Sequence, residues 1–119
     1  MKKSIVFCGP MASGKTWTSM GISNFFPNKH IFISKNHILF KPLIEFSPKT
    51  QLEKDLRKKL KNIKLIIIDD CVDADEITQF EPVLECFSNI NFIFCTQSAF
   101  VTKLSLEKYH VVRCSRNAL

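Results

Sequence analysis

Eight consecutive residues near the start of the chain have the types and spacing of a phosphate-binding loop. They read Gly9-Pro10-Met11-Ala12-Ser13-Gly14-Lys15-Thr16, or Gly-x-x-x-x-Gly-Lys-Thr. Backbone N–H groups of such a loop and of the helix that follows it converge on anionic oxygens, which the helix dipole also favours. Lys15 would reach the β- and γ-phosphates, and the Thr16 hydroxyl would ligate Mg²⁺. We assign nucleotide binding to these eight residues together with Trp17, which follows directly.

The flanking sequence supplies the setting that this loop requires, a strand before it and a helix after it. A strand is predicted over residues 4–8, from the apolar run that ends at Cys8. A helix is predicted over residues 15–26, and Pro27 closes it because proline cannot continue a helix. The alternative is an ordinary surface turn before a helix.

Two adjacent carboxylates, Asp69 and Asp70, follow the apolar run Leu65-Ile66-Ile67-Ile68. This run shows no alternation, which is typical of a strand covered on both faces in a parallel sheet. Ligands bind at the carboxyl ends of such strands. Asp69 would hold Mg²⁺ through its water shell, and Asp70 would polarise an attacking water as general base. Ordinary turn chemistry is the alternative for this pair.

A further apolar run over residues 91–95 predicts another strand, and it ends in Thr96-Gln97. A polar group at the end of a strand beside the Asp69-Asp70 strand would lie between the γ-phosphate and the attacking water. Thr96 or Gln97 is therefore a candidate for positioning that water or sensing the phosphate. A polar turn after a strand is the alternative.

The remaining pattern completes an alternation of strands and helices. Strands are predicted over residues 30–33 and 110–114, helices over residues 50–62 and 77–88, and an extended stretch over residues 38–46, which Pro42 interrupts. The first of these helices follows from the spacing of Leu52, Leu56 and Leu60, which places them on one face. Thr50 and Glu53 have the spacing of a helix capping box. Strand-helix alternation predicts an α/β fold with a mostly parallel, five-stranded sheet, and the length of 119 residues suits one domain spanning residues 1–119.

Cysteine usage and hydropathy favour a reducing, intracellular compartment without a membrane span. The chain has five cysteines and no Cys-x-x-Cys pair, which argues against a disulfide framework and a zinc cluster. Four of them, Cys8, Cys71, Cys95 and Cys114, follow or end predicted strands and are expected to be small buried residues lying close together. No apolar run approaches the length of a membrane span.

The net charge of +6 is compatible with a polyanionic partner. Lysines and Arg57 gather on one face of the predicted helix at residues 50–62. A solvated helix face is one interpretation, and a surface that contacts nucleic acid is the other.

Taken together, Gly9 to Thr16, Asp69-Asp70 and Thr96-Gln97 resemble the motifs of the phosphate-loop NTPases of the additional-strand branch. Within that branch the chain looks most like the ATPase domains of superfamily 3 helicases, found in replication proteins of small DNA viruses and plasmids, and like other AAA+-type ATPases. The resemblance implies a three-layer α/β/α fold in which the sensor strand inserts between the two motif-bearing strands. It also implies hydrolysis of ATP with Mg²⁺, and self-association or a larger partner.

Such ATPases often use an arginine finger, for which Arg113 and Arg116 are candidates because they end the last predicted strand. The alternatives are a small nucleotide or metabolite kinase, which would share Lys15, Thr16 and Asp69, and a nucleotide-dependent binding module with little turnover. No guanine-reading Asn-Lys-x-Asp element occurs in the chain, which favours ATP over GTP.

Overall fold

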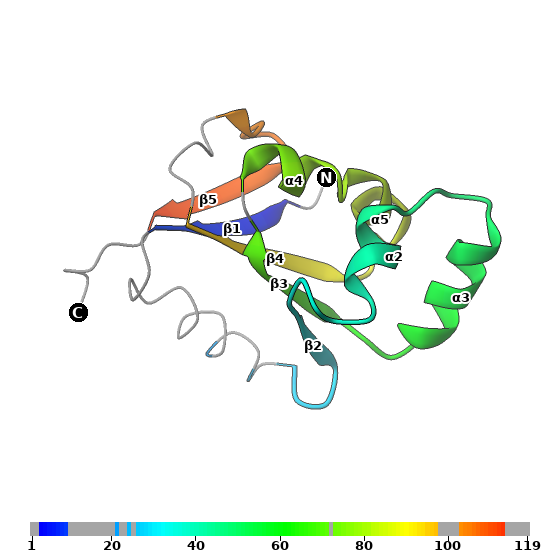
Figure 1. The fold of residues 1–119 in the computed structure, drawn as a ribbon. Helices are drawn as coiled ribbons and strands as arrows, with labels where there is room; N and C mark the ends of the chain where they lie inside the picture. Colours follow the sequence, from blue (N-terminus) through cyan, green and yellow to red (C-terminus); the bar gives the residue numbers. More distant parts are fainter. Residues whose placement is uncertain are drawn as a thin grey trace.

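The structure is a computed structural model that describes residues 3–9, 21, 24, 26–71, 73–97 and 103–113, with the side chains of Asp70 and Cys71 left out. Its strands are β1 (Ser4–Cys8), β2 (His30–Ile33), β3 (Leu65–Cys71), β4 (Asn91–Thr96) and β5 (Tyr109–Arg113). They form one sheet in the order β2-β3-β4-β1-β5, and every pairing is parallel (Figure 1). The predicted α/β fold with a five-stranded parallel sheet is therefore confirmed. β4 lies between β1 and β3, as the resemblance implies.

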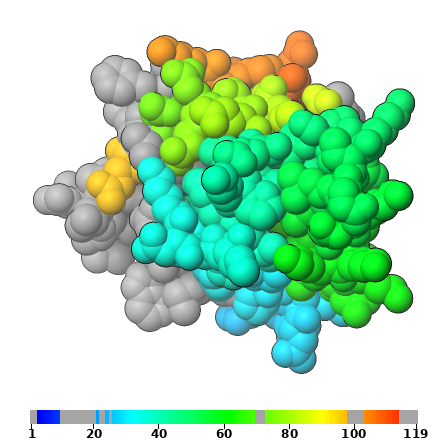
Figure 2. Space-filling model, turned by 45° about the vertical axis from the view of Figure 1, so that its right-hand side comes forward, coloured from blue at the N-terminus to red at the C-terminus, as the bar shows by residue number. Residues whose placement is uncertain are grey.

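The described helices are α2 (Phe40–Ile44), α3 (Gln51–Lys59), α4 (Ala74–Thr78) and α5 (Glu81–Cys86). They lie on the same face of the sheet (Figure 1). Each of them contributes buried side chains to the cluster that contains Ile66 and Ile68 of β3. Figure 2 shows the outer surface that these helices form, with α3 in green beside α2.

Both faces of β3 are buried, which explains the absence of alternation in its sequence. Ile66 and Ile68 belong to the cluster beneath the helices, whereas Leu65 and Ile67 belong to a second cluster on the opposite face. None of the four is more than 1% exposed. The predicted helix at residues 15–26 lies almost wholly outside the described residues, although Phe26 packs against the second cluster.

The predicted extended stretch at residues 38–46 is wrong, because α2 occupies its centre. Leu39, Leu43 and Phe46 are buried at spacings of four and three, which is the period of a helix and not of a strand. Pro42 is tolerated because N–H groups in the first turn of a helix have no partner within it. The interval between these apolar residues was the signal that could have identified α2.

One predicted helix, residues 77–88, is two short helices. Asp73 begins α4, where its Oδ1 accepts a hydrogen bond from the Glu76 N–H over 2.9 Å. The chain then turns at Gln79 and Phe80, and Pro82 lies in the first turn of α5. Phe80 is fully buried at this turn, which explains why the apolar pattern runs through it.

The predicted capping box at Thr50 and Glu53 is wrong in its hydrogen bonds, although Thr50 does precede the first turn of α3. The Thr50 hydroxyl donates to the Ser47 carbonyl oxygen over 2.8 Å. Glu53 Oε1 accepts from the Lys49 N–H over 2.8 Å, one residue earlier than the box requires. The carboxylate therefore stabilises the turn before the helix.

Candidate functional site

Because all strands are parallel, their carboxyl ends meet at one edge of the sheet (Figure 1). Gly9 follows β1 at this edge, Asp69 and Asp70 lie near the end of β3, and Thr96 ends β4. In the register of the sheet, Thr96 is the partner of both Cys8 in β1 and Cys71 in β3. The sequence-predicted residues of these three strands therefore converge on the same edge.

Thr96 and Gln97 have different environments. Thr96 is 1% exposed, and its carbonyl oxygen accepts a hydrogen bond from the Gly9 N–H over 3.1 Å. Gln97 is exposed. Of the two residues expected to face a phosphate or a water, Thr96 is the one held between the neighbouring strands.

Gly9 has a backbone conformation that suits glycine. Its φ of 155° lies in the positive region that residues with a Cβ atom rarely adopt. The chain thus leaves β1 through a residue that can turn without steric cost. This gives a physical reason for glycine at the first position of the Gly-x-x-x-x-Gly-Lys-Thr sequence.

The register between β3 and β4 shifts at the paired aspartates, as it does at a β-bulge. Ile68 is the partner of Phe94, and the next recorded pair is Cys71 with Thr96, so β3 advances by three residues while β4 advances by two. A bulge bends the strand and changes the direction of its side chains, and bulges are common beside active sites. The extra residue falls in the Asp69-Asp70 segment, and nothing in the sequence predicted it.

The described part of this edge is compatible with a divalent cation but does not complete a site for one. Asp69 is half-buried and supplies carboxylate oxygens, the ligands that Mg²⁺ prefers. Among the described residues, no three His, Cys, Asp or Glu side chains gather around one metal position. Thr16, the other predicted ligand, lies outside the described residues, as do Pro10 to Lys15, Trp17 and Arg116.

Arg113 lies at the same edge as Gly9 and Thr96. It is the last residue of β5, the register partner of Cys8, and exposed. β5 pairs directly with β1, the strand that leads into the predicted loop. Its role as an arginine finger stays a prediction.

Cys8 and Cys95 lie one register position apart on the neighbouring strands β1 and β4, but on opposite faces of the sheet. Cys8 packs in the cluster beneath the helices, whereas Cys95 packs in the cluster on the opposite face of the sheet. Both are buried, as predicted. Cys114 and the side chain of Cys71 lie outside the description.

The basic face of α3 contains two kinds of residue. Lys54, Lys58 and Lys61 are exposed. Arg57 is exposed as well, but it donates through Nε to Glu53 Oε2 over 2.9 Å, and its guanidinium lies 4.8 Å from the centre of the Phe87 ring. The hydrogen bond with Glu53 raises the pKa of Arg57. Arg57 is therefore held by contacts within the molecule, whereas none of the three lysines makes such a contact with another described residue.

No family model matches this chain, and the search of curated proteins found no relative. Within the described residues, none of the helices combines the length and the apolar character needed to cross a membrane. The assignment of the site thus depends on its own residues and their placement.

Proposed function

We propose that this protein is a phosphate-loop NTPase with a three-layer α/β/α fold, which binds ATP with Mg²⁺ at the carboxyl edge of its sheet and hydrolyses it. The single observation that carries the proposal is the position of β4. This strand ends in the buried Thr96, between the strand that leads into Gly9 and the strand that contains Asp69 and Asp70.

The proposed roles follow from the residue types at this edge. Lys15 and the backbone of Gly9 to Thr16 would bind the phosphates, while Thr16 and Asp69 would hold Mg²⁺, which would neutralise negative charge on the phosphates. Asp70 accepts a proton from the attacking water. Thr96 is favoured over Gln97 as the residue that positions this water, because Thr96 contacts both neighbouring strands.

From the resemblance alone, we propose that this protein is the ATPase core of a viral or mobile-element replication protein, and that it self-associates or joins a larger partner. The exposed lysines of α3 would be the contact for nucleic acid. Figure 1 shows α3 at the end of the sheet away from the strand arrowheads, so this contact would be remote from the nucleotide.

The direct test is calorimetric titration with Mg-ATP and Mg-GTP. We expect the wild-type protein to bind ATP, and the Lys15→Ala variant to lose this binding. Lys41→Ala is the matched control, because Lys41 is an exposed lysine on α2. The proposal fails if the wild type binds neither nucleotide, or if Lys15→Ala binds as the wild type does.

Phosphate release then separates the classes of function. Release from ATP without an acceptor supports an ATPase. Tight binding without release supports a binding module, and release that requires an added acceptor supports a kinase. The assay is repeated with single-stranded DNA, because stimulation by DNA would support the helicase-type setting.

A further inference from the structure

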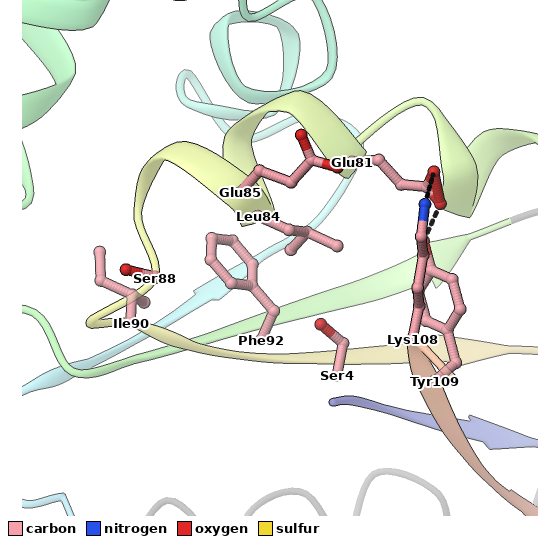
Figure 3. A pocket seen from close by; sticks show the side chains of 9 residues that line it. All are labelled: Ser4, Glu81, Leu84, Glu85, Ser88, Ile90, Phe92, Lys108 and Tyr109. Carbon is pink, nitrogen blue, oxygen red and sulfur yellow. Dashed lines mark hydrogen bonds and ion pairs between the residues drawn. The ribbon is translucent and has the colours of Figure 1, made fainter. Parts of the chain in front are cut away.

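A cavity of about 190 Å³ lies at the amino ends of β1, β4 and β5 (Figure 3). Ser4, the first residue of β1, and Tyr109, the first residue of β5, line it. Ile90, which directly precedes β4, lines it as well. Since Gly9 follows the other end of β1, this cavity and the proposed nucleotide site are at opposite ends of the same strand.

The middle of the cavity is apolar. Leu84 projects from α5 and Phe92 from β4, and Figure 3 shows them between Ile90 at one end and Tyr109 at the other. Phe92 is 3% exposed and belongs to the core beneath the helices. A ligand here would therefore lie against a rigid hydrocarbon surface.

One wall of the cavity is fixed by a polar network around Glu81. Tyr109 donates from its hydroxyl to Glu81 Oε2 over 2.9 Å, and Lys108 Nζ lies 3.4 Å from Glu81 Oε1. Figure 3 shows both contacts reaching the same carboxylate. The ammonium group of Lys108 thus compensates the charge of Glu81.

Glu85, an exposed residue one helical turn after Glu81, also lines the cavity and brings a second carboxylate to its rim. Within the described part of the chain, no hydrogen bond or ion pair engages it. The cavity therefore has two carboxylates against one ammonium group. Burial raises the pKa of Tyr109, and the hydrogen bond to Glu81 and the negative charges of Glu81 and Glu85 raise it further.

We propose that this cavity binds a small organic ammonium compound with an apolar body, which pairs its charge with Glu85 and packs its body against Leu84 and Phe92. An anionic ligand is disfavoured because Lys108, the cation of the lining, already pairs with Glu81. A second nucleotide is disfavoured for the same reason. The inference does not depend on the proposed ATPase function.

The test uses three probes of similar shape: phenethylamine, phenethyl alcohol and phenylacetate. Each is titrated into the isotopically labelled protein, and amide chemical shifts are followed by NMR. We expect phenethylamine to shift residues that line the cavity and to bind about threefold to fivefold more tightly than the alcohol, as for a partly exposed ion pair. Phenylacetate is expected not to bind.

Glu85→Gln should lower the affinity for phenethylamine to that of the alcohol and leave the alcohol unaffected. Glu45→Gln is the matched control, because Glu45 is an exposed glutamate that does not line the cavity. Three results overturn the proposal: no binding of phenethylamine, equal binding of all three probes, or an unchanged affinity in Glu85→Gln.

Discussion

The backbone N–H of Gly9 donates a hydrogen bond to the carbonyl oxygen of Thr96 over 3.1 Å. This bond extends the pairing of β1 and β4 by one residue beyond the strand and fixes the point at which the chain turns away. The start of the predicted phosphate-binding loop is thereby tied to the strand that ends in the candidate sensor.

Replacing Gly9 by alanine should destabilise the protein. The new Cβ atom would be strained at a φ of 155°, with an expected loss of about 1–3 kcal/mol in the free energy of unfolding. Gly21→Ala is the control, since a Cβ atom there meets nothing within 4 Å. Urea denaturation measures both, and equal losses would contradict the strain at Gly9.

The two aspartates of β3 should differ in their effects. Asp69→Asn is expected to raise the Mg²⁺ concentration needed for half-maximal ATP hydrolysis, because a metal contact is weakened. Asp70→Asn should lower turnover by roughly 10²-fold or more, the usual contribution of a general base, with nucleotide affinity retained. Steady-state phosphate release over a range of Mg²⁺ concentrations distinguishes the two, and identical profiles would refute separate roles.

Neutralising Arg57 should lower the melting temperature, whereas neutralising Lys58 should not. Arg57→Gln loses the hydrogen bond to Glu53 and the contact with the Phe87 ring, while Lys58 is exposed on the same helix. Thermal unfolding followed by circular dichroism gives the comparison. A lower melting temperature in Lys58→Gln alone would reverse our interpretation of this face.

The stability contributed by Glu53 should depend on pH. Its hydrogen bonds with the Lys49 N–H and with Arg57 lower its pKa from the ordinary 4.5. The contribution is therefore present above pH 4.5 and is lost as the pH falls through the lowered value. Glu53→Gln should be less stable than the wild type at pH 7, and this difference should shrink at acidic pH. Thermal unfolding of both proteins at several pH values measures it.

Tyr109 should make the fold sensitive to alkaline pH. Burial, the hydrogen bond to Glu81 and nearby carboxylates raise its pKa above the ordinary 10.0. Its contribution is complete below pH 10 and is lost as the pH rises toward the raised value. Tyr109→Phe should be less stable at pH 7, by about 1.5–3 kcal/mol for a hydrogen bond to a charged group, yet lose less on alkaline titration. Denaturant titrations at several pH values measure the free energy of unfolding of both proteins. An equal loss of this free energy in the wild type and in Tyr109→Phe above pH 10 would count against the prediction.

Several features were predictable because they follow from local patterns. The run at residues 65–68 identified a strand buried on both faces, and the spacing of Leu52, Leu56 and Leu60 identified α3. These predictions succeeded because the hydrophobic pattern that determines which side chains are buried lies within one continuous segment of the sequence.

Features that depend on pairing between distant segments were not predictable in the same way. The register shift at Asp69-Asp70 is a mismatch between β3 and β4, which are separated in sequence by two helices. The cavity similarly requires α5 to lie over the amino ends of β1, β4 and β5. The hydrogen bonds around Thr50 are a third case. The residue types of a capping box are present, but Thr50 bonds to Ser47 and Glu53 bonds to Lys49.

β2 forms one border of the sheet and has four residues. Lys29 precedes it directly, and Lys35 follows two residues after its end. A second chain that tried to add a strand here would gain few ladder hydrogen bonds, beside a strand flanked by lysines, a residue type that commonly protects edge strands. Assembly of several copies, if the protein forms rings or filaments, should therefore use another surface and leave this border unextended.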